Sequence, residues 1–197
     1  MKTIILARHA ESELGAAARL NGDPSVVNGL TEAGREQARS LGEALAGREL
    51  DLAVSSEFPR VRQTVELALA GRAIERLILP ELNEIRFGLW EGRPADEYLA
   101  WAWSHGPEEP CPGGGESRTD AVFRLARGFR TILERDERTA LVVGHGLALR
   151  YVLNAIDGSD PRPRLDKVPL AEPIEADAAD FRRALERLER WLQSPAW

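Results

Sequence analysis

The sequence has little of several residue types, and each shortage excludes a class of structure. Cys111 is the single cysteine in 197 residues, so no disulfide can form within the chain and a cysteine-based metal site is not expected. No apolar run approaches the roughly 20 residues of a membrane span. The N-terminal apolar run 4–7 ends at Arg8, which is too short for a signal peptide. We therefore expect a cytoplasmic protein that does not enter a membrane.

Lysine is also scarce, because Lys2 and Lys167 are the two lysines among 26 basic residues. Any anion site in this chain will therefore be built from arginine, whose planar guanidinium can donate two parallel hydrogen bonds. Acidic residues outnumber basic ones, and the formal net charge is −6. That balance argues against nucleic acid as the main partner.

The order of apolar segments predicts the fold class. Length and a composition of 43% hydrophobic and 29% charged residues favour one globular domain over residues 1–197. Short apolar runs predict strands and longer periodic segments predict helices. The expected strands are 3–7, 51–55, 73–79, 139–143 and a short one at 167–170, and the expected helices begin near 31, 59, 117, 147 and 177. Alternating strands and helices predict a three-layer α/β/α sandwich around a mostly parallel sheet.

Residues 81–115 break this alternation and predict an irregular, lid-like excursion. The segment is rich in proline and carries Trp90, Tyr98, Trp101 and Trp103. Long connections are often functional lids, and the tryptophans favour an ordered one. These aromatic side chains could wall a binding pocket or simply pin the segment to the core. In the helix that follows, apolar residues at helical spacing predict the buried face, and Phe123 is among them, with Val122, Ala126, Phe129, Ile132 and Leu133.

Charged residues follow four successive predicted strands. Arg8 and His9 follow the first strand, Arg60 begins the helix after the second, Glu84 follows the third, and His145 follows the fourth. Each alone has an ordinary interpretation as a solvent-exposed or core residue. Because ligands of such sheets bind beyond the carboxyl ends of the strands, we expect all five side chains to meet at one edge. Two histidines, two arginines and a carboxylate there indicate a site for an anion, such as phosphate.

The same side chains suit phosphoryl transfer. A histidine among arginines has a lowered pKa, so its neutral, nucleophilic form persists at neutral pH. Phosphoryl transfer otherwise needs charge stabilisation and a proton for the leaving oxygen. Glu84 could supply that proton if its surroundings raise its pKa.

Six motifs run in order between residue 3 and about residue 155. They are Ala7-Arg8-His9-Ala10-Glu11-Ser12, Gly29-Leu30-Thr31-Glu32-Ala33-Gly34 with Gln37-Ala38, Ser55-Ser56-Glu57-Phe58-Pro59-Arg60 with Gln63-Thr64, Leu82-Asn83-Glu84 with Phe87-Gly88-Leu89-Trp90-Glu91-Gly92, Gly114-Gly115-Glu116-Ser117, and Val143-Gly144-His145-Gly146. In this order and spacing the chain resembles the histidine phosphatase superfamily, in the branch typified by cofactor-dependent phosphoglycerate mutase and its bacterial phosphatase relatives.

The resemblance implies a role for each matching residue. His9 would be the nucleophile that becomes phosphorylated, and Glu84 would protonate the leaving alkoxide and then activate water. The phosphoryl oxygens would be held by Arg8, Arg60, His145 and the backbone N–H of Gly146. The family uses no metal, and we expect no other cofactor.

Two positions depart from the family pattern. Ala10 stands where the family usually has glycine, and Gly15 stands where it usually has an asparagine that binds phosphate. Asn21, just before Gly22, is a possible substitute for that amide. With these departures, the further expected substrate-binding residues are Ser12, Asn21, Gly22, Gly146 and Trp101.

The sequence is compatible with more than one function. The family's mutases carry a basic insertion in the region where this chain has the acidic residues Asp96, Glu97, Glu108 and Glu109, which would serve an acidic phosphoglycerate poorly. We therefore favour a metal-independent phosphatase acting on a small phosphorylated metabolite. The alternatives are a phosphoglycerate mutase and a non-catalytic phosphate-binding protein. The sequence is compatible with a monomer or a homodimer.

Overall fold

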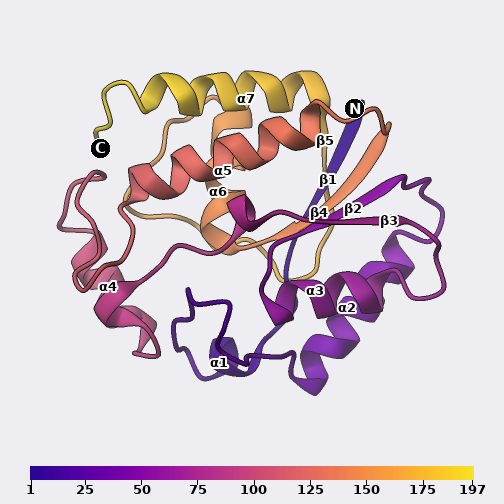
Figure 1. Ribbon diagram of the computed structural model, residues 1–197, viewed down its shortest axis with the longest axis horizontal. Helices are drawn as coiled ribbons and strands as arrows, with labels where there is room; N and C mark the ends of the chain where they lie inside the picture. The colour runs from indigo at the N-terminus through magenta and orange to yellow at the C-terminus, as the bar shows by residue number, and fades with distance from the viewer.

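The chain folds around a five-stranded mixed sheet with helices on both faces (Figure 1). The computed structural model describes all residues from 1 to 197. The strand order is β3-β2-β4-β1-β5, with β1 (Thr3–Arg8), β2 (Leu52–Ser55), β3 (Glu75–Ile78), β4 (Thr139–Gly144) and β5 (Ile174–Asp177). The first four are parallel, and β5 pairs antiparallel with β1. The predicted α/β/α sandwich with a mostly parallel sheet is confirmed.

Successive side chains of the central strands pack alternately into two hydrophobic cores, one on each face of the sheet. Ile4 and Leu6 of β1 pack on the face covered by α5 (Arg118–Leu133), α6 (Gly146–Ile156) and α7 (Ala178–Trp191). Ile5 and Ala7 pack on the face covered by α2 (Glu32–Ala44) and α3 (Pro59–Ala68). A strand buried on both faces is apolar at every position, which is why β1 appears in the sequence as an unbroken apolar run.

The helices begin where their capping residues predict. Thr31 caps α2, its hydroxyl accepting from the Gly34 backbone N–H at 2.9 Å. Pro59 occupies the first turn of α3, where its missing N–H costs nothing. At the start of α5, Ser117 and Asp120 form a capping box in which each side chain bonds to the other's backbone N–H.

The segment 81–115 is ordered and contains one helix that the sequence pattern did not reveal. It includes two 3-10 turns, Pro80–Leu82 and Gly88–Trp90, and the helix α4 (Ala95–Ala102). Phe87, Tyr98 and Ala102 pack with Ala121 of α5 in a small third core. A second short helix, α1 (Glu13–Ala16), follows β1 in the chain and was not among the expected elements.

Two expectations are wrong. Residues 167–170 are not a strand: Leu170 makes only an isolated bridge to Arg8, and the fifth strand is β5 instead. Only Ala176 of β5 is buried, so this edge strand lacks the apolar run by which strands are recognised. Phe123 is 59% exposed, because the buried stripe of α5 runs through its neighbours rather than through it.

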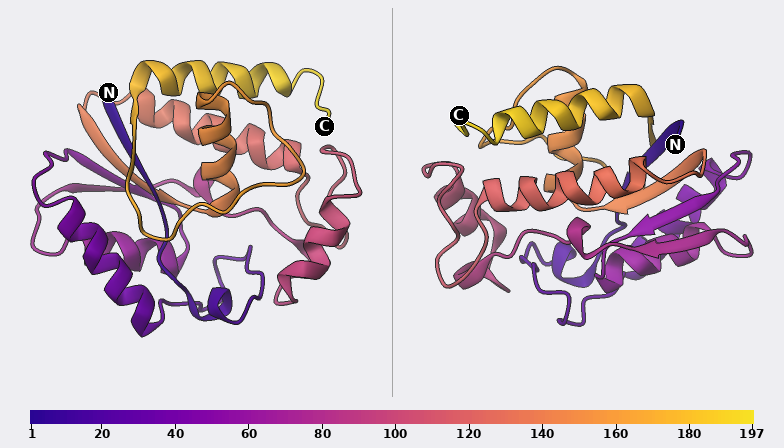
Figure 2. Two further views of the ribbon diagram at one scale, coloured as in Figure 1. Left: turned by 180° about the vertical axis from the view of Figure 1, so that it is seen from behind. Right: turned by 45° about the horizontal axis from the view of Figure 1, so that its top comes forward.

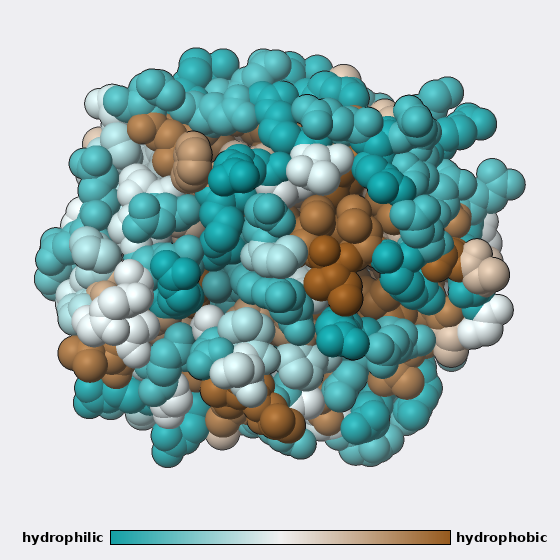
Figure 3. All heavy atoms as spheres, in the orientation of Figure 1, coloured by the Kyte–Doolittle hydropathy of each residue, from teal (hydrophilic) through white to brown (hydrophobic).

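The face of the molecule seen in Figure 3 is mostly hydrophilic, with hydrophobic patches among the hydrophilic residues. No helix combines the length and apolar character needed to cross a bilayer. The connection 157–173 between α6 and β5 runs across one side of the molecule (Figure 2). It contributes Val168 and its neighbours to the surroundings of Arg8, as described next.

Candidate active site

The strand ends bring the two predicted site histidines together. Arg8 and Gly144 are register partners at the carboxyl ends of the neighbouring strands β1 and β4. His9 and His145 each follow directly, and their rings lie edge to face with centroids 5.4 Å apart. The site therefore sits where ligands of parallel sheets usually bind.

His9 is held with its ring nitrogen Nε2 unprotonated. Its Nδ1 lies 2.8 Å from the Ala10 carbonyl oxygen, which can only accept, so Nδ1 carries the proton. Its Nε2 accepts a hydrogen bond from Arg60 Nε at 3.2 Å. Burial, and then the positive charge of Arg60, hold the pKa of His9 well below its usual value. The ring is therefore neutral at neutral pH, with a lone pair on Nε2.

Arg60 connects the parts of the site. Beyond His9, its Nη1 donates to Asn21 Oδ1 at 2.6 Å, and its Nη2 donates to the Asn21 carbonyl at 3.1 Å and to His145 Nδ1 at 3.2 Å. The guanidinium also stacks over the Phe58 ring at 4.3 Å. Burial lowers its pKa to about 10, so the group stays charged at neutral pH. These contacts hold the guanidinium plane in one orientation.

His145 is fully buried beside Arg60. Because Nδ1 accepts from Arg60, the ring proton lies on Nε2 and is donated to the Ser56 hydroxyl at 2.9 Å. The Phe58 ring packs edge-on against it at 4.8 Å. Burial and the charge of Arg60 hold the pKa of His145 well below its usual value. In this state His145 is neutral as well.

Glu84 places a carboxyl group against these residues. Its Oε2 lies 3.8 Å from His145 Nδ1, and its Oε1 accepts from the Ile85 backbone N–H at 3.1 Å. Burial raises the pKa of Glu84, against an opposing effect of Arg60. A carboxyl group with a raised pKa beside a neutral histidine can supply a proton to a leaving oxygen.

Arg8 offers an unused donor. Its Nη1 donates to the Val168 carbonyl at 3.1 Å, while its Nε is enclosed and has no partner. An unpaired buried donor costs about 1–3 kcal/mol, so an acceptor atom bound here would be stabilised. A Cβ added at Gly146 would lie 3.4 Å from Arg8 Nε, and glycine at that position therefore leaves room beside the guanidinium.

Asn21 is in the site but faces Arg60. Its Oδ1 accepts from Arg60 Nη1 and from Asn28 Nδ2, and its own Nδ2 donates to the Asp23 carbonyl at 2.8 Å. Its amide hydrogens thus point into its own loop. Asn21 therefore orients Arg60. The sequence pattern did not indicate this contact.

The other loop residues near the site also have partners within the protein. The Ser12 hydroxyl caps α1 by accepting from the Gly15 backbone N–H at 3.3 Å. The Gly22 backbone N–H donates to Glu91 Oε2 at 2.8 Å. The Ala10 methyl belongs to the core beneath the site, and its N–H donates to Thr64 Oγ1 at 3.0 Å. The fold therefore accommodates alanine where the family usually has glycine.

A cavity of about 420 Å³ adjoins this cluster. Its lining includes Arg8, Glu84, Tyr98 and Trp103, and most of the other lining residues are apolar. Trp101 does not line it. Instead, Trp101 stacks on His105 with ring centroids 4.6 Å apart and lies against Tyr98. Tyr98 and Trp103 therefore form part of the wall of this cavity. Trp101 instead packs within the segment 81–115 and helps to hold it against the core.

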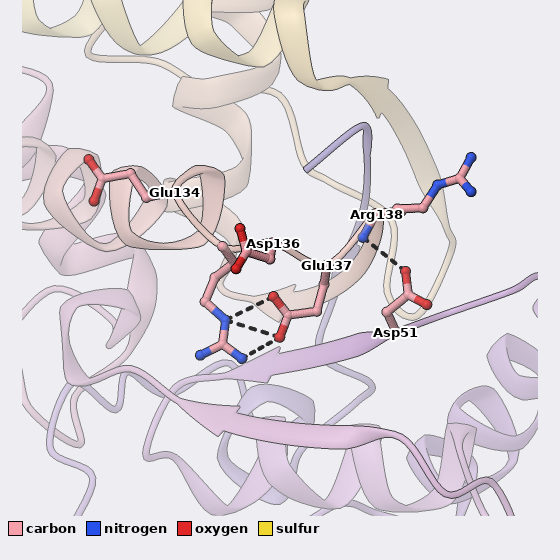
Figure 4. A pocket seen from close by; sticks show the side chains of 6 residues that line it. Asp51, Glu134, Asp136, Glu137 and Arg138 are labelled. Carbon is pink, nitrogen blue, oxygen red and sulfur yellow. Dashed lines mark hydrogen bonds and ion pairs between the residues drawn. The ribbon is translucent and has the colours of Figure 1, made fainter.

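A larger hollow, of about 670 Å³, lies at the opposite end of the strands, near the amino ends of β2 and β4 (Figure 4). It is lined by the charged residues Asp51, Glu134, Arg135, Asp136, Glu137 and Arg138. Asp51 Oδ2 accepts the backbone N–H groups of Arg138 and Thr139 at 3.0 and 2.9 Å, which ties β2 to β4 at their amino ends. Arg135 pairs with Glu137 and Glu75 here, and the hollow holds neither of the two site histidines, so we place the candidate site at the carboxyl ends of the strands.

Comparison with known proteins agrees with this geometry. A family model described as the histidine phosphatase superfamily (branch 1) matches residues 4–192. The chain is 37% identical over 150 residues to an adenosylcobalamin/alpha-ribazole phosphatase of Salmonella typhimurium, covering 71% of this chain and 72% of that protein. It is 30% identical over 199 residues to a 2,3-bisphosphoglycerate-dependent phosphoglycerate mutase of Brucella ovis, covering 90% and 94%. The crystal structure of a putative alpha-ribazole-5'-P phosphatase from Escherichia coli is similar, with a TM-score of 0.76, 28% identity and 89% of each chain covered.

Proposed function

The chain belongs to the histidine phosphatase superfamily, and on that premise we propose that it hydrolyses phosphomonoesters of small molecules through a phosphohistidine at His9. The observation that carries this proposal is the fixed state of the His9 ring. Its Nδ1 proton is held by the Ala10 carbonyl, and its Nε2 lone pair faces Arg60. A neutral imidazole in a ring of guanidinium groups is suited to attack a bound phosphoryl group.

In the first step, His9 Nε2 attacks phosphorus and the bond from phosphorus to the ester oxygen breaks. Arg8 and Arg60 provide guanidinium groups for the phosphoryl oxygens, and the unpaired Arg8 Nε supplies one donor. Neutral His145 accepts from Arg60 through Nδ1 and so helps to orient that guanidinium. These preorganised donors stabilise the charge that develops on the transferring group. Glu84, with its raised pKa, gives its proton to the leaving alkoxide.

In the second step, water attacks phosphorus and the bond from His9 Nε2 to phosphorus breaks. The carboxylate that Glu84 has become takes the proton from the water, so both residues return to their starting states. The products are inorganic phosphate and the free alcohol. The same residue therefore serves as the acid first and as the base second.

The apolar cavity beside Arg8 and Glu84 favours phosphatase over mutase activity. Ten of its 17 lining residues are hydrophobic, which suits an organic leaving alcohol better than a small polar phosphoglycerate. The similarity to a phosphoglycerate mutase makes that activity the second candidate. It would appear as interconversion of the monophosphoglycerates, stimulated by 2,3-bisphosphoglycerate.

The test is hydrolysis of p-nitrophenyl phosphate without added metal, compared between the unmodified chain and His9→Ala. We expect slow to moderate turnover that the substitution abolishes. Turnover on no phosphomonoester together with tight phosphate binding would identify a non-catalytic phosphate-binding protein. Interconversion of monophosphoglycerates without net hydrolysis would identify a mutase.

A further inference from the structure

The cavity beside the reacting centre is mostly apolar but not entirely so. Apolar side chains reach it from the loop after β1, from the segment 81–115, from α6 and from the connection before β5; they include Leu20, Phe87, Leu99, Trp103, Leu147 and Leu165. A leaving group bound there would be surrounded by hydrocarbon and aromatic surface. Arg118, the first residue of α5, also lines this cavity.

Arg118 is buried but incompletely paired. Its side chain and backbone together are only 6% exposed. Its Nε donates to the Tyr98 hydroxyl at 2.9 Å, and its Nη1 donates to the Tyr151 hydroxyl at 2.8 Å. Its Nη2 makes no hydrogen bond and is not among the enclosed orphaned atoms, which are Arg8 Nε and Trp90 Nε1. Nη2 is therefore not fully enclosed, and of the two cavities that Arg118 lines, the other one, beside Trp101 and Glu116, has a volume of only about 10 Å³.

The charge of Arg118 has no counterion in the protein. No carboxylate oxygen lies within ion-pair distance of it, whereas Arg124, further along the same helix, pairs with Glu116 at 2.9 Å. Burial raises the pKa of Tyr98 and of Tyr151, so both phenols are neutral partners. Buried charges are normally paired. A cation left uncompensated at the wall of a substrate-sized cavity has the chemistry of an anchor for an anionic group.

We propose that Arg118 determines specificity by binding a carboxylate on the leaving alcohol, so that preferred substrates are phosphomonoesters with an apolar body and a carboxylate remote from the ester. The inference rests on the proposed function, because it takes Arg8 and Glu84 as the reacting end of the cavity. The apolar walls accept the body of the alcohol, and the free Nη2 of Arg118 pairs with the carboxylate. A charge-assisted hydrogen bond in a desolvated pocket discriminates more strongly than apolar contact alone.

Binding of non-hydrolysable phosphonates tests the inference separately from turnover. Calorimetry would compare benzylphosphonate with its 4-carboxy, 4-carboxymethyl and 4-(2-carboxyethyl) derivatives, and each acid with its neutral amide. We expect at least one acid to bind about tenfold or more tightly than benzylphosphonate and than its own amide. Equal affinities across all three acids, their amides and the parent would overturn the proposal, whatever the variants show.

Variants then assign the preference to a side chain. Arg118→Met should reduce the preference for the acid to near onefold, while Arg127→Met, an exposed arginine on the same helix, should retain it. Lys167 also lines the cavity, at its exposed rim, so Lys167→Met is the decisive comparison. A preference lost in Lys167→Met and kept in Arg118→Met would overturn the assignment to Arg118. If Arg118→Met does not fold, the comparison of acids with amides and the Lys167 variant still decide.

Turnover of phenyl phosphate is measured beside these titrations. Hydrolysis without any preference for the acids contradicts the inference about Arg118 and leaves the proposed function standing. A clear preference among the phosphonates, with no hydrolysis of any ester, contradicts the proposed function and leaves Arg118 as a ligand-binding residue.

Discussion

Replacing Arg60 by lysine keeps the positive charge but removes the planar fork, and it should eliminate most of the activity. The guanidinium of Arg60 reaches His9 Nε2 and His145 Nδ1 at the same time, each at 3.2 Å. A lysine ammonium is a single point on a flexible stem and cannot hold both positions at once. We therefore expect a phosphoryl group bound between these residues to lose about two charge-assisted hydrogen bonds.

The size of the effect follows from that count. A hydrogen bond to a charged group contributes about 1.5–3 kcal/mol, so two of them contribute about 3–6 kcal/mol. Each 1.36 kcal/mol changes the rate tenfold, which predicts a loss of about two to four powers of ten in kcat/KM.

The assay is hydrolysis of p-nitrophenyl phosphate, with circular dichroism to show that the variant is folded. Arg62→Lys, on the exposed side of the same helix, is the matched control and should retain activity. An Arg60→Lys variant with kcat/KM within about fivefold of the unmodified chain would refute the role of the guanidinium fork.

Three further predictions concern the acid, the pH dependence and the fold. Glu84→Gln should reduce kcat/KM far more for an alkyl phosphate than for p-nitrophenyl phosphate, because only the poor leaving group needs a proton; equal losses would contradict its role as acid. Because the pKa of His9 is lowered, neutral His9 persists below pH 6.5, so kcat/KM should fall only at more acidic pH; the raised pKa of Glu84 should produce the fall on the alkaline side. That alkaline limb should be absent from the pH profile of Glu84→Gln. Ser117→Ala removes the cap of α5 and should cost about 1 kcal/mol, lowering Tm by about 2–4 °C in a thermal melt; an unchanged Tm would refute it.

The central part of the fold could be predicted from the sequence because its signals are local. Strands buried on both faces are continuous apolar runs, and capping residues in the sequence indicate where helices start. The antiparallel strand β5 lies at the sheet edge with only Ala176 buried, so its pattern gave no apolar run. Leu170, by contrast, belongs to an apolar stretch but makes only one bridge. Edge strands depend on the partner strand, which a local pattern does not contain.

The reacting cluster could be predicted because its members follow successive strands of one parallel sheet. The contacts of the residues around this cluster could not be predicted. The sequence predicts Asn21 as a phosphate donor, whereas in the structure its side-chain and backbone carbonyl oxygens orient Arg60. Trp101 and Trp103 are two residues apart, and only the packing of α4 decides that Trp103 lines the cavity and Trp101 does not. Arg118 follows a helix cap, where nothing local distinguishes it from a solvent-exposed residue.

The central claim is that the His9 ring carries the phosphoryl group during turnover. The most direct measurement is rapid quenching of the chain with a ³²P-labelled phosphomonoester, followed by identification of the labelled residue by mass spectrometry under alkaline conditions that preserve phosphohistidine. We predict label on His9 that forms and decays at least as fast as product is released, and no label in His9→Ala. Steady turnover with no labelled protein, or label that persists on another residue in His9→Ala, would contradict the account.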